Sequence, residues 1–252
     1  MNRNELVIYL DDQLRTGEIA DISLNGLQFP GASEISKVAL AVDACLETTE
    51  QAISAGAQML LVHHGLFWKG QDYGPIGPAQ KAQLKALVES DLNLYASHLP
   101  LDLHPELGNN AELCRLVGLD APHRWLDYEG NKLGFWGEFA ADVTLAELGS
   151  KLETALGEAP RVLEFGAGSA GRTGICSGGS QEGIKEAAEL GMDTFILGEM
   201  AHYMFHFARE RGLNIILAGH YLTETVGVKA VGRLLEEKFG LDTVFIDVPT
   251  GL

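Results

Sequence analysis

Three pairs of side chains in this sequence combine residue types that bind metals. Each pair falls where an apolar run ends: His63 with His64, His98 with Asp102, and His220 with Glu224. Imidazole nitrogens and carboxylate oxygens, with no cysteine among them, suit a borderline first-row metal such as Zn, Mn or Fe. The set is large enough for two ions bridged by carboxylates. Paired ions can generate hydroxide at neutral pH and polarise the bond that it attacks.

Each pair also has a structural interpretation. One of the adjacent histidines could pack in the core while its neighbour lies at the surface. Either carboxylate could cap a helix, and Glu224 could lie in a first helical turn, where its charge suits the helix dipole. Taken singly, these structural interpretations are favoured. The same residue types at matching places in the two halves of the chain favour a shared metal site instead.

The elements that must position these side chains alternate between strand and helix. Apolar runs bounded by turn residues predict parallel βαβ units. A Gly/Pro-containing loop, KGQDYGPIGP, interrupts them at 69–78. The predicted strands are 38–43, 58–62 and 92–96, and the predicted helices are 46–55 and 79–89.

The second half of the chain repeats this plan. Residues 37–65 align without a gap with residues 172–200, so that His63 and His64 correspond to Gly198 and Glu199. Residues 92–102 resemble 213–224 with one extra residue in the latter. The predicted fold is therefore α/β, with two pseudo-repeated βαβ-type lobes that form one metal-binding core. Because ligands of open α/β sheets bind beyond the carboxyl ends of the strands, we expect the polar endings to face one cleft.

The predicted core comprises residues 1–124 and 171–252. Between them, residues 125–170 have the size of a small inserted α+β segment, with a helix that begins after Thr144 and strand-like residues at 161–165. The glycine-rich stretch GAGSAGRTG at its end precedes a strand rather than a helix. A connector is therefore a better interpretation of it than a phosphate loop.

Composition limits the class of protein. The formal net charge of −17 disfavours nucleic acid or an anionic membrane as the main partner. No apolar run approaches the roughly 20 residues needed to cross a bilayer, and the N-terminus lacks the pattern of a signal peptide. Three widely spaced cysteines form neither a metal-binding pair nor a disulfide framework. We expect a cytoplasmic protein.

Other side chains near the motifs are weaker candidates. His202 and His206 lie four residues apart, and we expect them to be partly buried beside Met204 and Phe205 rather than to bind metal. His104 and His123 have the setting of loop histidines. Glu199 and His98 are candidates for proton transfer. Trp68 and Lys69 directly follow the histidine pair and are candidates to stack on and neutralise a substrate, the alternative being an aromatic lid packed on the protein.

Several separated motifs resemble one known family in order along the chain. LLVHHGLFWKG, SHLPLDLHPELGNN, ILGEM, AGHYLTETVGVKAVGRLL and FIDVP closely resemble the Nif-three-like dinuclear-metal proteins, often catalogued as GTP cyclohydrolase 1 type 2 homologues. The resemblance implies a two-lobed protomer with two metal ions and a homohexameric toroid with sites facing its interior. Carried over by motif, the implied ligands are His63, His64, Asp102, His220 and Glu224, with His98 beside them. The segment 125–170 is too short for the larger inserted domain of some members.

The leading hypothesis is a dinuclear metal-dependent hydrolase that acts on a nucleotide or similar heterocycle. The family name suggests opening of the purine imidazole ring of GTP with release of formate. One alternative is a toroidal regulatory or protein-interaction protein whose metal site is not primarily catalytic. Another is a phosphoester hydrolase that uses the same metals and releases phosphate.

Overall fold

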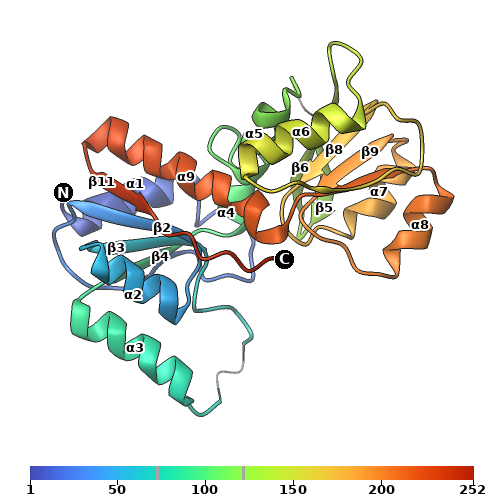
Figure 1. Cartoon of the computed structure of the whole chain (residues 1–252). Coiled ribbons are helices and arrows are strands. Elements are labelled where there is room, and N and C mark those ends of the chain that lie inside the picture. The colour runs from blue at the N-terminus through green and yellow to red at the C-terminus, as the bar shows by residue number, and fades with distance from the viewer. Residues whose placement is uncertain (72–73, 121–122) are drawn as a thin grey trace. The chain divides into compact units, whose positions relative to one another are not determined.

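The structure, a computed structural model, describes residues 1–71, 74–120 and 123–252. It divides into two compact units, coloured along the chain in Figure 1. The first unit comprises Met1–His104 and Gly227–Val248, and the second comprises Pro105–Val226 and Pro249–Leu252. The loop expected at 69–78 includes residues 72–73, which lie outside the described part of the chain.

The first unit contains a five-stranded sheet in the order β1-β4-β3-β2-β11. Strands β2, β3, β4 and β11 are parallel, and β1 is antiparallel to β4 at the edge. The parallel strands therefore present their carboxyl ends at one edge of the sheet. Their bounds are β1 Gly26–Phe29, β2 Lys37–Asp43, β3 Met59–His64, β4 Asn93–Ala96 and β11 Asp242–Phe245.

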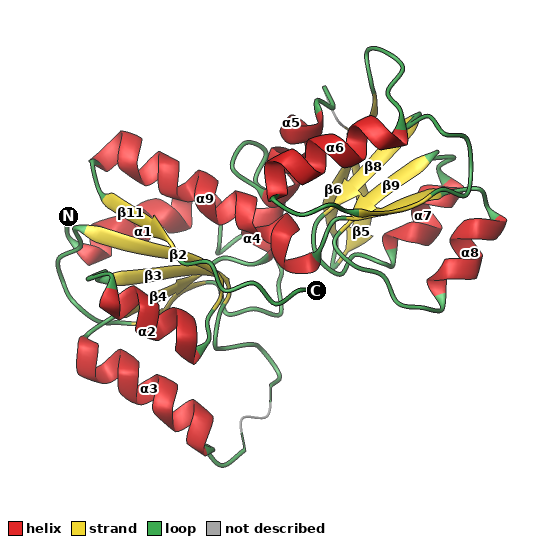
Figure 2. Ribbon diagram, viewed as in Figure 1, coloured by secondary structure: helices red, strands yellow, loops and turns green. Residues whose placement is uncertain are grey.

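Helices cover both faces of this sheet (Figure 2). Alternate residues of β2 belong to different core clusters: Val38 and Leu40 pack with α1 and α9, whereas Ala39 and Ala41 pack with α2 and α3. A strand that is apolar on both faces is the reason for the continuous run VALAV. The helices are α1 Arg3–Leu14, α2 Leu46–Ser54, α3 Pro78–Ser90, α4 Leu99–Leu103 and α9 His220–Phe239, of which the residues before Gly227 count with the second unit.

The second unit contains a six-stranded sheet in the order β5-β6-β8-β9-β10-β7. Strands β8, β9 and β10 are parallel, while β7 and the β5–β6 hairpin are antiparallel to their neighbours. Helices α5 and α6 pack on one face around Ile175, Ile196 and Ile216. The strands are β5 His123–Tyr128, β6 Asn131–Glu138, β7 Arg161–Leu163, β8 Arg172–Cys176, β9 Thr194–Leu197 and β10 Asn214–Leu217. The helices are α5 Asn109–Val117, α6 Leu145–Leu156, α7 Gly183–Glu189 and α8 Met204–Glu210.

The two sheets share one topology, because β1-β4-β3-β2 and β7-β10-β9-β8 have the same order and the same antiparallel edge. One detail repeats as well. The fully buried Asn93 accepts a hydrogen bond from Gly31 N at 2.7 Å, and the fully buried Asn214 accepts one from Gly166 N at 2.8 Å. A Cβ at either glycine would lie 2.2 Å from a backbone oxygen. This close backbone approach explains why both positions are glycine.

The α/β fold and its parallel βαβ units are confirmed, and helix α6 begins directly after its N-cap Thr144. Strand β3 extends beyond the expected 58–62 and includes both histidines. Residues 125–170, expected as an inserted segment, supply β6, α6 and β7 to the sheet and core of the second unit. The division into a core of 1–124 with 171–252 and an insertion stays a prediction. Among the described residues, no helix is both long and apolar enough to cross a membrane.

Candidate metal centre

Three imidazole rings gather at the carboxyl edge of the first sheet. His63 and His64 are the last residues of β3, and His98 follows β4. The ring centroids of His63 lie 4.6 Å from His64 and 5.1 Å from His98. Neighbouring side chains in a strand point to opposite faces, yet these rings meet because the strand ends there. One ligand atom from each of the three residues lies within 4.8 Å of the others.

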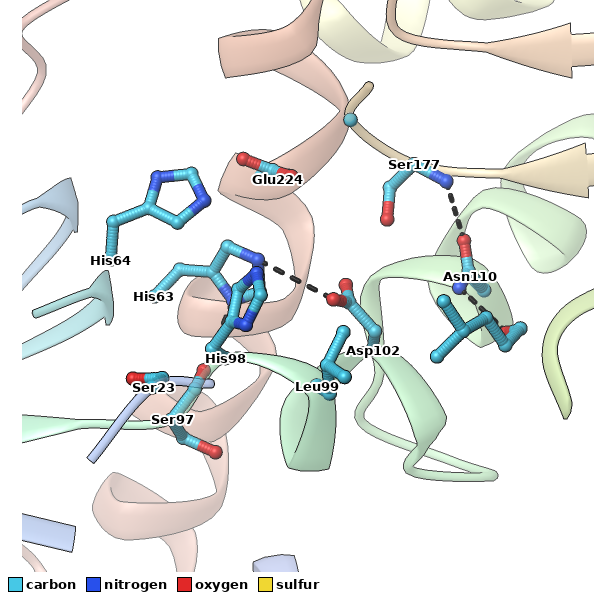
Figure 3. Close-up of polar contacts among 12 residues, drawn as sticks. Ser23, His63, His64, Ser97, His98, Leu99, Asp102, Asn110, Ser177 and Glu224 are labelled. Atoms are coloured by element: carbon cyan, nitrogen blue, oxygen red, sulfur yellow. Dashed lines mark hydrogen bonds and ion pairs between the residues drawn. The ribbon is translucent and has the colours of Figure 1, made fainter. Parts of the chain in front are cut away.

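Each of the three rings is held at Nδ1 by an oxygen acceptor. His63 Nδ1 lies 3.0 Å from the carbonyl oxygen of Ser97, and Figure 3 draws both residues. His64 Nδ1 lies 2.8 Å from Oδ1 of Asp43, and His98 Nδ1 lies 2.9 Å from Oδ1 of Asp21. An acceptor at Nδ1 places the proton on that nitrogen, so that Nε2 carries the lone pair. Orientation of this kind is typical of histidines that bind metals.

A buried carboxylate belongs to the same group. Asp102 on α4 is 7% exposed, and its Oδ2 lies 3.5 Å from Nε2 of His63. Figure 3 shows its side chain directed toward the His63 ring. The first unit therefore offers three imidazoles and one carboxylate, which are nitrogen and oxygen donors only.

The second unit contains a smaller group of the same chemistry. His220 and Glu224 lie one turn apart at the start of α9, with Nε2 of His220 3.2 Å from Oε1 of Glu224. Nδ1 of His220 lies 2.9 Å from Oε1 of Glu199, which follows β9. Glu224 is 4% exposed. Its hydrogen bond to His220, aided by Glu199 and opposed by burial, raises the pKa of His220 to about 9.

His220 and Glu224 occupy space that is free because residue 178 is a glycine. Gly178 has φ +64°, and a Cβ there would lie 2.3 Å from Oε1 of Glu224 and 3.2 Å from Nε2 of His220. Its amide donates to Oγ1 of Thr223 at 3.0 Å. Any larger residue would push against the two donor atoms, so the site depends on the absence of a side chain at position 178.

The donor chemistry fits a first-row metal ion. Imidazole and carboxylate donors suit Zn, Mn and Fe, and all four histidines have the oriented Nδ1 that metal ligation favours. Carboxylates that raise the pKa of His220 also create a negative local field, which attracts a cation. When bound, a divalent ion would supply Lewis acidity and lower the pKa of a water molecule.

Comparisons with known proteins identify the family and support the fold. The model of the family Duf34/NIF3 (NGG1p interacting factor 3) matches residues 1–251. This chain belongs to the Duf34/NIF3 family. A Deinococcus radiodurans protein named GTP cyclohydrolase 1 type 2 homolog is 41% identical over 252 residues, covering 100% of this chain and 95% of that protein. A Pyrococcus abyssi protein of the same name is 42% identical over 253 residues and is covered completely.

A solved structure supports the fold independently. The crystal structure of a Thermus thermophilus protein matches with a TM-score of 0.89 and 41% identity, and the match covers 100% of both chains. The family resemblance inferred from the motifs is confirmed. Among the described residues of this Duf34/NIF3 protein, the predicted His63, His64, His98 and Asp102 come together in one unit, and His220, Glu224 and Glu199 come together in the other.

Sequence reasoning missed Asp21, Asp43 and Gly178. Asp43 ends the strand VALAVD and aligns with Gly178 in the repeat. This difference between the two halves is the sequence signal that could have identified both positions. Asp21 carried no signal, because its partner His98 is 77 residues away. The structure therefore adds two carboxylates that hold histidines of the first unit. It also adds one glycine, Gly178, that leaves room for His220 and Glu224 in the second unit.

The remaining candidates have mixed outcomes. Trp68 lies beside the histidines, its ring centroid 5.1 Å from that of His98. Lys69 Nζ donates to the carbonyl oxygen of Asp21 at 2.8 Å, which fixes the Asp21 loop. Substrate binding by either residue stays a prediction. The expected partial burial of His202 and His206 is wrong: both are exposed, because α8 begins only at Met204 and buries Met204 and Ala208 instead.

Proposed function

We propose that this protein is a metal-dependent hydrolase with a dinuclear centre, in which two divalent ions (Zn, Fe or Mn) bind to five residues of one chain. The proposed ligands are His63, His64, Asp102, His220 and Glu224. The observation that carries the proposal is the donor set itself: buried carboxylates beside imidazoles whose Nδ1 atoms are already engaged by acceptors. Such a set is costly to bury without a cation.

The leading substrate is a purine nucleotide. The names of the Deinococcus and Pyrococcus relatives support GTP. Hydrolytic opening of the imidazole ring at the carbon between its two nitrogens breaks two C–N bonds, consumes two water molecules and releases formate. In this scheme His98 and Glu199 move protons, Trp68 stacks on the base, and Lys69 faces the phosphates.

The metal assignment is tested by elemental analysis of protein purified without chelator. Wild type should contain two ions per chain, and His63→Ala and Glu224→Ala should each lose most of this content. The two residues lie in different units, so the pair tests the proposed donors of both units. Near-zero content in all three proteins would overturn the proposal.

The reaction is tested by incubating the metal-loaded protein with GTP and measuring formate and phosphate. Formate that depends on metal and is lost in Glu224→Ala supports ring opening. Release of phosphate without formate would replace ring opening by phosphoester hydrolysis. A fully loaded, folded protein that gives no formate above a chelated control would eliminate GTP as the substrate.

A second candidate function is favoured by the family description, which names an interacting factor. In this alternative the protein is a regulatory or protein-interaction ring whose metal site is not primarily catalytic. A partner captured equally well by wild type and by Asp102→Ala, with no turnover on a nucleotide panel, would support it. A homohexamer and a cytoplasmic location stay predictions, and light scattering after gel filtration tests the hexamer.

A further inference from the structure

The carboxylate of Asp21 is deeply buried, and both of its oxygens accept hydrogen bonds. Its side chain is 1% exposed. Oδ1 accepts from Nδ1 of His98 at 2.9 Å and from Ser23 N at 3.0 Å, while Oδ2 accepts from Nδ2 of Asn25 at 2.8 Å and from Leu99 N at 3.0 Å. Four donors therefore fix the orientation of this buried carboxylate.

The loop that carries Asp21 is itself fixed to the segment after β3. Lys69 Nζ donates to the carbonyl oxygen of Asp21 at 2.8 Å, and Lys69 N donates to Ile22 O at 2.6 Å. Leu24 N donates to Phe67 O at 3.1 Å. The position of the carboxylate is therefore set by the same segment that follows His63 and His64.

The same loop also fixes the backbone of His98. Oδ1 of Asn25 accepts from His98 N at 2.8 Å, and Nδ2 of Asn25 is bonded to Asp21. Both the main chain and the ring of His98 are thus held from one loop. Such a two-point attachment restricts the ring far more than packing alone would.

The duplicated halves provide an independent argument. His98 and His220 correspond in the repeat, and each is held at Nδ1 by a carboxylate oxygen at 2.9 Å. The two carboxylates do not correspond: Asp21 precedes β1, whereas Glu199 follows β9 and aligns with His64. Inheritance through duplication therefore does not account for both. The corresponding histidines of the two halves therefore each bond to a carboxylate, and the two carboxylates come from different elements.

We propose that Asp21 is a positioning residue that acts through His98 and orients it as a third imidazole donor of the first unit, in addition to the five ligands proposed above. For His98, this donor role replaces the proton-transfer role of the hydrolase scheme. The carboxylate keeps the proton on Nδ1, so that Nε2 carries the lone pair. One ligand atom of His98 lies within 4.8 Å of ligand atoms of His63 and His64. The predicted effect of Asp21 on metal binding rests on the proposed function. The predicted Nδ1–H tautomer of His98 does not require a metal.

Asp21→Asn is the direct test, with Asp11→Asn as matched control. Asp11 also holds other side chains in the first unit, since its Oδ1 accepts from the hydroxyl of the buried Tyr95 and from Oγ1 of the half-buried Thr16, both at 2.9 Å. Neither of these hydrogen-bond partners is a histidine. Cobalt(II) titration followed by visible absorption reports both affinity and ligand geometry. Asp21→Asn should weaken cobalt binding about 10–100-fold and shift the absorption bands. Asp11→Asn should change neither, even if it lowers the Tm.

Two further measurements keep the test decisive. If Asp21→Asn fails to fold, His98→Gln takes its place and should produce the same loss of affinity and band shift. Long-range ¹H–¹⁵N NMR of the metal-free protein should show the Nδ1–H tautomer of His98 in wild type. Unchanged affinity and bands in Asp21→Asn or His98→Gln would overturn the inference, and so would an Nε2–H tautomer. Wild type that binds no cobalt yet shows the Nδ1–H tautomer would remove the proposed function and the donor role, leaving only the positioning contact.

Discussion

Oδ1 of Asp43 lies 2.8 Å from Nδ1 of His64, and the two residues are paired in register at the ends of the parallel strands β2 and β3. Strand pairing alone therefore brings the carboxylate to the imidazole. Because Asp43 is partly exposed, the contact contributes little to folding. Its consequence is the orientation of the ring.

Asp43→Asn should therefore affect metal binding more than stability. We expect about 10–100-fold weaker zinc affinity, because the ring loses the charged partner that fixes its tautomer. The Tm should change by no more than a few degrees. Competition with a chromophoric chelator measures the affinity, and Glu47→Gln, on the exposed first turn of α2, is the control. Equal affinities in the two variants would contradict the assignment of His64 as a ligand.

Gly178→Ala should damage the second donor group. The new Cβ would lie 2.3 Å from Oε1 of Glu224, so the carboxylate must move. Gly191→Ala is the matched control, because Gly191 has a similar φ of +66° and nothing within 4 Å of the new Cβ. Both substitutions carry the backbone cost of about 1–2 kcal/mol for a left-handed residue.

Only Gly178→Ala should also lower the metal content. Urea denaturation and elemental analysis of the two variants separate the backbone cost from the loss of the site. If both variants keep the full metal content of wild type, the packing of Glu224 and His220 against Gly178 is unrelated to metal binding.

The sequence predicts the elements that depend on local patterns. Continuous apolar runs such as VALAVD identify the buried parallel strands, and Thr144 with Glu147 identifies the start of α6. The histidines and their following carboxylates are recognisable because they end those runs. The contact of Asp21 with His98 and the pairing of β6 with β8 are not predictable in this way. Both depend on contacts between distant segments, which a single sequence does not encode in any local period.

Asn93 and Asn214 should be equally important for stability, because each links a strand to the loop that crosses beside it. Each amide accepts from a glycine N–H and donates to the next residue's carbonyl oxygen, Ala32 O at 2.9 Å and Ala167 O at 2.8 Å. Replacement by Ala leaves buried backbone groups unsatisfied, at about 1–3 kcal/mol each. We expect Asn93→Ala and Asn214→Ala each to lose at least about 2 kcal/mol, measured by urea denaturation.

The exposed Asn4 provides the control for this pair, and Asn4→Ala should stay within about 0.5 kcal/mol of wild type. A large loss in one half and none in the other would show that the repeated contact has kept its role in only one unit. Similar losses would establish it as a shared structural requirement of the duplicated fold.

Alkaline pH should destabilise the protein through two groups buried in their neutral form. Burial raises the pKa of the Cys114 thiol to about 12 from 9.0, and burial together with the nearby Asp11 raises the pKa of Tyr95 well above 10.0. Above about pH 9 the unfolded chain releases the Cys114 proton, and above about pH 10 it also releases the Tyr95 proton, while the folded chain keeps both. The unfolded state then binds fewer protons, so the free energy of unfolding falls as pH rises, by about 1.4 kcal/mol per pH unit for each group.

Urea denaturation between pH 8 and pH 10.5 measures this slope. Cys114→Ala removes the thiol, so its stability should fall less steeply with pH than that of wild type, even though the smaller side chain lowers its stability at every pH. Cys45→Ala, at the half-buried N-cap of α2, is the control for loss of a cysteine. Parallel slopes in wild type and Cys114→Ala would mean that the Cys114 thiol ionises as readily in the folded chain as in the unfolded one. That result would contradict the burial of Cys114 in the core cluster of the second unit.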